Sequence, residues 1–323
     1  MNPDQVCQPV AIDRRAIPGE ARESRWLAGD GRAVRRIDWA TAAGVPRGSL
    51  LFLPGRADFY EKYLETLSYW HARGWRVTAA DWRGQAGSGR LGLDAVTGHI
   101  DDFAVWIADL AAFWAEWMRN VPGPHVIVGH SMGGHLVLRA LAERKVDPVA
   151  AIVTAPMLGL HPGCVPPALL HAAARLMVRL GDRRRPAWTW SEKPGALPAD
   201  RISLLTHDPA RYADEAWWRE ARPELVMGPG SWGWIAAALA SIRLLARPGA
   251  LESVRVPVLI IASDADRLVD FAGTERAAQR LPHGEMLRFG TEARHEILRE
   301  VDPVRDKALA AIDAFLDRVA PAG

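Results

Sequence analysis

Short apolar runs alternate with helix-like segments through the first half of the chain. The candidate strands are residues 49–53, 75–80, 125–128 and 149–154. The segments between them place apolar side chains three or four positions apart, which predicts helices. These candidate helices are residues 61–73, 102–119 and 132–144. Alternation of this kind predicts a mostly parallel sheet with helices on both of its faces.

Two features frame this alternating region. At the N-terminal side, residues 24–28 and 33–39 flank Gly29-Asp30-Gly31 and predict a hairpin. At the other side, the residues after about 156 contain no strand-like run until residue 256. The candidate helices of this stretch are residues 167–180, 208–221 and 232–245.

The alternating pattern returns near the C-terminus. A strand is predicted over 256–262, followed by a helix over 271–281, a strand over 285–289 and a helix over 303–319. We therefore predict a discontinuous α/β core formed by residues 1–156 and 250–323. Residues 157–249 would form a helical cap inserted into it.

Charge and composition exclude several classes of function. Lysine and arginine number 40 and aspartate and glutamate 38, so no basic excess is available to bind nucleic acid. The longest clearly apolar stretch, residues 234–242, is far shorter than the ~20 residues of a membrane-spanning helix. The N-terminus lacks the pattern of a signal peptide, so we expect a cytoplasmic protein. Cys7 and Cys164 show no metal-type spacing, and we expect neither a metal nor a cofactor.

One motif suggests nucleophilic catalysis. Residues 129–133 read Gly-His-Ser-Met-Gly, after the apolar run 126–128 and before a helix-period segment. This is the strand–turn–helix setting in which Ser131 would be presented as a nucleophile, and tight turns of this kind need glycine. The alternative is a glycine-rich turn that contains a serine by chance.

A serine nucleophile needs a base and an acid that orients it. In this architecture the order along the chain is serine, acid, histidine. Three aspartates follow the late strand, and of these we favour Asp266 as the acid. Asp264 could instead stabilise the turn, and Asp270 resembles a helix N-cap. His295 lies between the last strand and the last helix and is the expected base.

The attacked carbonyl needs backbone N–H donors for its developing charge. The residue after the nucleophile, Met132, should supply one, and Arg56 in the loop after the first buried strand the other. The Arg56 side chain could reach an anionic substrate or point to solvent. Gly55 lets this loop turn, and we expect Gly55 and His130 to border the substrate.

Tryptophan is unusually frequent, at 14 residues against 7 phenylalanines. Several of these tryptophans fall in the predicted cap, where ordinary packing between helices is one explanation. The alternative is a channel for an apolar substrate above Ser131, with Trp234 in its wall. A cap of this kind could also contact a membrane surface transiently.

Several segments together resemble one known group of proteins. They are residues 53–56 (Leu-Pro-Gly-Arg), 61–63 (Glu-Lys-Tyr), 81–84 (Asp-Trp-Arg-Gly), 87–90 (Gly-Ser-Gly-Arg), 129–134, 263–269 and His295. In these residues the chain resembles the α/β-hydrolase superfamily, and within it the monoacylglycerol lipase and bacterial lysophospholipase L2 group. The resemblance implies a serine hydrolase with a helical cap that acts on esters of single-acyl-chain lipids. It also implies Ser131, Asp266 and His295 as the triad.

The chain departs from this group at two places. Pro54-Gly55 stands where related lipases often have His-Gly, and Ala86 stands where glycine is common. Because the first loop borders the acyl pocket, a short-chain carboxylesterase, a thioesterase or a peptidase remains an alternative. A ligand-binding member without catalysis is a further alternative. The sequence does not predict the oligomeric state.

Overall fold

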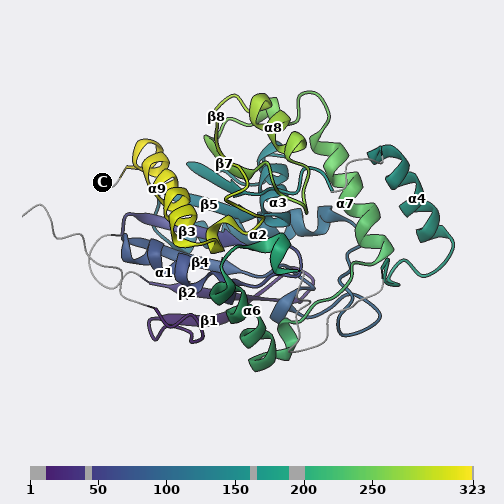
Figure 1. The fold of residues 1–323 in the computed structure, drawn as a ribbon, viewed down its shortest axis with the longest axis horizontal. Helices are drawn as coiled ribbons and strands as arrows, with labels where there is room; N and C mark the ends of the chain where they lie inside the picture. The colour runs from purple at the N-terminus through teal and green to yellow at the C-terminus, as the bar shows by residue number, and fades with distance from the viewer. Residues whose placement is uncertain (1–11, 41–45, 161–165, 189–200, 322–323) are drawn as a thin grey trace, which may run out of the picture.

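A computed structural model describes residues 12–40, 46–160, 166–188 and 201–321 (Figure 1). Cys7 and Cys164 lie outside these residues. The described chain forms an eight-stranded sheet in the order β1-β2-β4-β3-β5-β6-β7-β8. Two strands at one edge are antiparallel to their neighbours, and the remaining pairs are parallel. The predicted mostly parallel sheet is confirmed.

The strands agree closely with the sequence pattern. They are β1 (Ala21–Leu27), β2 (Ala33–Trp39), β3 (Gly48–Leu53), β4 (Trp75–Ala80), β5 (His125–His130), β6 (Ala150–Thr154), β7 (Val258–Ser263) and β8 (Gly284–Phe289). Two starts differ by more than one residue, because β1 begins at Ala21 instead of residue 24 and β7 begins after Pro257 instead of at residue 256. A proline has no N–H to donate to a neighbouring strand, so pairing begins one residue later.

Helices cover both faces of the sheet. They are α1 (Leu64–Ala72), α2 (Phe103–Asn120), α3 (Met132–Ala142), α8 (Phe271–Arg280) and α9 (Asp302–Val319). Leu50 and Phe52 of β3 join the core formed with α1 and α9, whereas Leu51 and Leu53 join the core formed with α2 and α3. The side chains of a strand alternate between faces, so a wholly apolar strand serves two cores. The predicted helix over 61–73 begins as a 3-10 turn at Tyr60–Tyr63.

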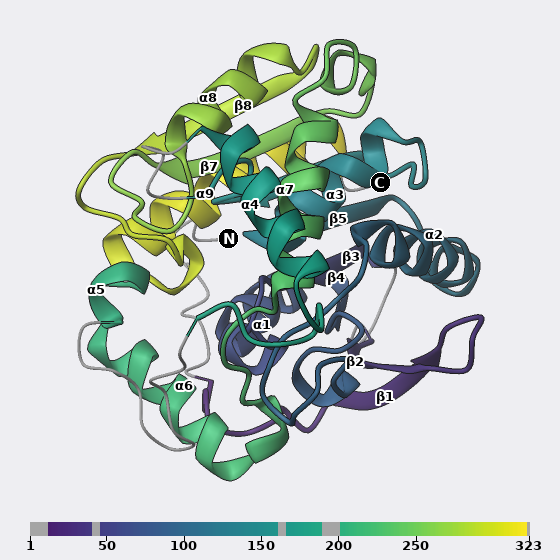
Figure 2. The ribbon, with the colours of Figure 1, turned by 90° about the vertical axis from the view of Figure 1, so that its right-hand side faces the viewer.

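The helices of the predicted cap lie between β6 and β7 in the chain. They are α4 (Pro167–Arg179), α5 (Ile202–Leu205), α6 (Pro209–Ala221) and α7 (Trp232–Leu245). The three longer helices were predicted, but α5 was not, because a single turn is too short to show a period. In Figure 2, α4 lies in front of α7 on the side that faces the viewer. Among the described residues, no helix is both long and apolar enough to cross a bilayer.

Candidate active site

Ser131 lies on a sharp turn between β5 and α3. Its φ of 51° is unusual for a residue other than glycine. A Cβ atom on Gly129 would lie 2.7 Å from the backbone of residue 133, and one on Gly133 would lie 2.3 Å from the carbonyl oxygen of Leu53. The two glycines of the motif are therefore needed because backbone segments approach one another closely at this turn.

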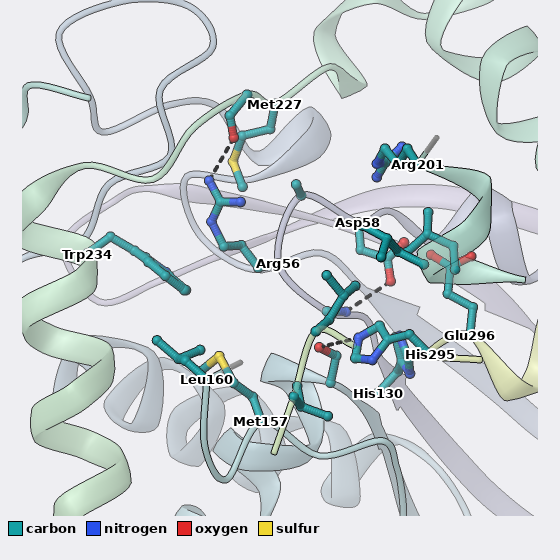
Figure 3. Close-up of a pocket in the computed structure, with 18 of the residues that line it drawn as sticks. Arg56, Asp58, His130, Met157, Leu160, Arg201, Met227, Trp234, His295 and Glu296 are labelled. Atoms are coloured by element: carbon teal, nitrogen blue, oxygen red, sulfur yellow. Dashed lines mark hydrogen bonds between the residues drawn. The ribbon is translucent and has the colours of Figure 1, made fainter. Parts of the chain in front are cut away.

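Three predicted residues meet at this turn although they are far apart in the chain. The His295 Nε2 atom lies 2.9 Å from Ser131 Oγ, a hydrogen bond drawn as a dashed line at His295 in Figure 3. The Nδ1 atom of His295 lies 2.7 Å from Asp266 Oδ2. The other oxygen of Asp266 accepts the backbone N–H groups of Leu268 (2.7 Å) and Val269 (3.1 Å). These bonds fix the orientation of the carboxylate toward the imidazole.

The two neighbouring aspartates lie elsewhere. Asp264 pairs with Arg288 at 2.6 Å on the partly exposed side of the loop. Asp270 caps α8 by accepting the N–H groups of Ala272 and Gly273, each at 3.1 Å. Of the three aspartates that follow β7, Asp266 is the one hydrogen-bonded to His295.

The surroundings of the buried imidazole favour its charged form. Burial alone lowers the pKa of His295, but the facing Asp266 carboxylate outweighs burial and raises that pKa above its ordinary value. Burial alone raises the pKa of Asp266, and His295 together with the two backbone N–H groups lowers it below its ordinary value. The adjacent His130 behaves differently, because burial, together with the nearby His295, lowers its pKa to about 4.

The loop after β3 contacts the serine directly. A Cβ atom on Gly55 would lie 3.1 Å from Ser131 Cβ, and the Gly55 N–H donates to Asp58 Oδ2 at 3.1 Å. Met132 is the first residue of α3, and its side chain is buried in the core. The backbone amides of Arg56 and Met132 remain our candidates for the oxyanion donors.

The structure places the Arg56 side chain in the wall of a cavity and not in open solvent. Its Nη2 group donates to the Gly228 carbonyl at 2.7 Å. The guanidinium carbon lies 5.1 Å from the centre of the Trp188 ring and 4.9 Å from that of Trp234. The half-buried side chain is therefore part of the pocket wall and does not point freely into solvent.

A cavity of about 590 Å³ opens above Ser131, and its two ends differ chemically. Trp234, Leu160 and Met157 lie at one end, and the charged side chains of Asp58, Arg201 and Glu296 lie at the other (Figure 3). Gly55, His130 and Trp234, predicted to border the substrate, all line this cavity. The tryptophan of residue 190 lies outside the described residues.

The charged end contains a buried cluster that the sequence did not predict. Lys62 Nζ lies 3.0 Å from Asp58, 3.1 Å from Glu215 and 2.5 Å from Glu296. Burial alone lowers the pKa of Lys62, but the three carboxylates outweigh it and raise that pKa. The cluster connects the loop of Gly55, the cap helix α6 and the residue after His295. Lys62 lay in a recognised segment, residues 61–63, but nothing in the sequence indicated its three carboxylate partners.

Comparison with known proteins places the chain in a family. A family model described as "Serine aminopeptidase, S33" matches residues 44–302. The chain belongs to the serine aminopeptidase S33 family. It is 31% identical to the lysophospholipase L2 of Escherichia coli (strain K12) over 287 residues, which cover 83% of this chain and 80% of that protein.

Two further proteins are similar to this S33 member, one in sequence and one in fold. A monoacylglycerol lipase of Mycolicibacterium smegmatis is 26% identical over 285 residues, covering 86% of this chain and 92% of its own length. A soluble variant of the monoglyceride lipase of Saccharomyces cerevisiae has a similar structure, with a TM-score of 0.75 and 19% identity. That match covers 96% of this chain and 98% of the yeast chain. The predicted resemblance and the α/β-hydrolase fold are confirmed, and the chain is a hydrolase.

Proposed function

We propose that this S33 member cleaves carboxylic esters of single-acyl-chain lipids through an acyl-enzyme. The observation that carries the proposal is the hydrogen-bonded series Ser131–His295–Asp266 at the floor of a cavity with an apolar end. The names of its relatives, a lysophospholipase and a monoacylglycerol lipase, support the same class of substrate.

In the proposed acylation step, Ser131 Oγ attacks the ester carbonyl while His295 Nε2 takes the hydroxyl proton. Asp266 accepts the hydrogen bond of Nδ1–H and stabilises the imidazolium that forms. The backbone amides of Arg56 and Met132 donate to the developing oxyanion. His295 then returns the proton to the alcohol as the ester bond breaks.

In the deacylation step, His295 removes a proton from a water molecule that attacks the acyl-enzyme. The tetrahedral intermediate uses the same two amides. Collapse of this intermediate returns the proton to Ser131 and releases the fatty acid. Each half-reaction needs only proton transfer and oxyanion stabilisation, and a chelator should leave its rate unchanged.

The two ends of the cavity suggest how the substrate lies. The acyl chain would occupy the end lined by Met157, Leu160 and Trp234, where burial of each methylene contributes about 0.8 kcal/mol. The alcohol part would face Asp58 and Arg201 at the charged end. A short-chain carboxylesterase, a thioesterase or a peptidase would use the same residues, and the description of the family model names aminopeptidases.

A hydrolysis panel with a labelling control tests the proposal. The panel contains p-nitrophenyl esters of increasing chain length, a monoacylglycerol, a lysophosphatidylcholine, a thioester and an amide. We expect kcat/KM to rise with acyl length and the single-chain lipids to be cleaved. A maximum at the acetyl ester, or preference for the amide or thioester, would favour an alternative.

The control addresses the nucleophile. A fluorophosphonate probe should label the wild-type protein, and Ser131→Ala should abolish both labelling and hydrolysis, with a loss on the order of 10⁶-fold in rate. Labelling of the Ser131→Ala protein would contradict the assignment. Failure of wild-type protein to hydrolyse any ester would favour a ligand-binding member.

Three further expectations belong to the same proposal, and they concern the bounds of the cap, the cellular compartment and contact with a lipid surface. The cap would be a unit of residues 157–249 inserted between the two parts of the core. The protein would work in the cytoplasm on lipid esters and would contact a lipid surface transiently through the cap. Limited proteolysis would test the cap boundaries, because exposed connecting segments are cleaved before packed helices.

A further inference from the structure

The loop that follows β3, residues 54–58, presents the Arg56 amide to the attacked carbonyl in the proposed mechanism. This loop lies directly against the nucleophile, since a Cβ atom on Gly55 would lie 3.1 Å from Ser131 Cβ. Ala57 has a φ of 54°, a left-handed conformation that is unfavourable for a residue with a Cβ atom. A backbone of this shape persists only where contacts from outside the loop hold it.

Side chains bind the amides on both sides of Arg56. The Gly55 N–H donates to Asp58 Oδ2 at 3.1 Å. The Ala57 N–H donates to Gln85 Oε1 at 2.9 Å. The Arg56 amide lies between these two bonded amides in the chain, so the direction in which it points depends on both bonds.

Gln85 lies in a different loop, and the turn that contains it does not need its side chain. Backbone bonds close that turn, from the Gln85 N–H to the Trp82 carbonyl at 3.0 Å and from the Ser88 N–H to the Gln85 carbonyl at 2.9 Å. The buried side chain reaches Ala57 instead. Because an N–H can only donate, the side-chain oxygen must face Ala57, and Nε2 has no hydrogen-bond partner among the described residues. An unpaired buried N–H is unfavourable, so the oxygen is the useful part of this side chain.

The loop that carries Gln85 is itself firmly anchored. Ser88 Oγ accepts the backbone N–H of Arg35, in β2, at 2.8 Å. Trp82 Nε1 donates to the Pro54 carbonyl at 2.8 Å, which is a second bond to the loop after β3. Gln85 therefore extends from a rigid support, and its oxygen has a defined position.

We propose that Gln85 is a positioning residue for the oxyanion hole, which holds the Ala57 amide and thereby directs the neighbouring Arg56 N–H toward the oxyanion. The proposal rests on the proposed function, in which the Arg56 amide is one of two donors. It extends that function to a side chain that does not line the described cavity. A donor must lie about 2.7–3.1 Å from the developing charge, so a small shift of the loop should cost much of the stabilisation.

Gln85→Met tests the proposal, because it keeps the length of the side chain and removes the oxygen. On a soluble ester we expect kcat to fall about tenfold to 100-fold, less than the 10²–10³-fold that loss of an oxyanion donor itself causes. KM should stay within about twofold of wild type, since ground-state binding does not use these donors. Gln85→Glu presents an oxygen at the same place and should recover most of the lost kcat.

A transition-state analogue separates positioning from a general structural role. In a long-chain trifluoromethyl ketone, the carbonyl carbon bonds to Ser131 Oγ, the hydroxyl proton passes to His295, and the carbonyl oxygen becomes the oxyanion. Gln85→Met should weaken inhibition by this ketone by the same factor as kcat. Inhibition by the fatty acid of equal chain length should not change, and neither should the midpoint of the pH profile, because His295 keeps its partners.

Ser49→Ala is the matched control. Ser49 lies at the other end of β3, and its buried hydroxyl donates to the Pro122 carbonyl at 2.6 Å. This variant also loses one buried side-chain bond, but it should keep kcat and ketone inhibition near wild type. Gln85→Asn, whose shorter side chain does not reach Ala57, should show the loss expected of Gln85→Met and replaces that variant if it does not fold.

The outcomes distinguish this inference from the proposed function. Equal losses of kcat in the Gln85 and Ser49 variants, a change in KM alone, or unchanged ketone inhibition would overturn the inference while ester hydrolysis by the wild type supports the proposed function. A wild-type protein that neither hydrolyses an ester nor binds the ketone would contradict the proposed function, and this inference with it.

Discussion

The two walls of the cavity are built in different ways. On the core side, Ser131, Asp266 and His295 follow β5, β7 and β8, and the backbone of the sheet fixes where each loop begins. On the cap side, the wall is held by bonds between loops and by three core arginines, Arg56, Arg90 and Arg294. Their side chains donate to the carbonyls of Gly228, of Glu224 and Val226, and of Ile202 and Thr206.

This difference separates the chemistry from the choice of substrate. A hydrogen-bonded sheet holds the reacting groups to within a fraction of an ångström, and such precision is what acid–base and nucleophilic catalysis require. Long arginine side chains lose more conformational entropy when they are ordered and allow more adjustment. Changes in the core wall should therefore abolish turnover, whereas changes in the cap wall should alter which esters fit.

The largest expected effect tests the core wall. Asp266→Asn should lower kcat by roughly 10³–10⁴-fold, as in serine-protease triads, because the amide favours the wrong imidazole tautomer. Asp264→Asn is the matched control, since Asp264 pairs with Arg288 away from the imidazole. Steady-state kinetics on one soluble ester measure both. Similar losses at the two positions would contradict the assignment of the acid.

The second prediction concerns the buried Lys62 cluster, which joins the core wall of the cavity to the cap wall. Lys62→Met leaves Asp58 without its ammonium partner and weakens the link to Glu215 of the cap. Removing one member of a buried ion cluster typically costs about 3–5 kcal/mol of the free energy of unfolding. Urea unfolding measures this loss, with the exposed Lys145→Met as control. If Lys62→Met lowers the free energy of unfolding no more than the control does, the Lys62 cluster does not stabilise the fold.

The third prediction uses the raised pKa of His295. The base must be neutral, so activity is lost when the imidazole is protonated as the pH falls. Because Asp266 raises that pKa above its ordinary 6.5, kcat/KM should decline through a midpoint above pH 6.5. His130, with a pKa of about 4, adds no second step in this range. The remaining activity of Asp266→Asn should show a midpoint at lower pH. An unchanged midpoint would mean that a group other than His295 titrates there.

The smallest expected effect tests the cap wall. Each methylene buried at the apolar end should favour the longer ester about fourfold until the cavity is full. Trp234→Ala should flatten this rise while leaving the rate for the acetyl ester within a few-fold of wild type. Trp217→Ala, a partly exposed tryptophan of α6 that does not line the described cavity, is the control. An unchanged slope in the Trp234 variant would place the acyl chain elsewhere.

The sequence by itself determined the elements of the core and the candidate reacting groups. Apolar runs marked the strands because both faces of a parallel sheet are buried, so these runs have no polar alternation. The serine motif could be recognised because its two glycines lie within five residues of one another, although Gly133 is required by the backbone of Leu53 on a neighbouring strand. The order of strands along the chain then indicated where an acid and a base should follow.

Only the tertiary structure decided how the cap meets the core. Lys62 and Glu296 are 234 positions apart, and no local pattern relates them. The sequence left open whether the Arg56 side chain points to solvent, and the positions of Trp188 and Trp234 in space keep it in the cavity wall. Leu169 and Leu176 of α4 are exposed, and they could be distinguished from core leucines only because α7 covers another face of the helix. Local periodicity encodes which side of an element is apolar. The element that packs against this side is determined by contacts between residues far apart in the chain, which exist only in the folded state.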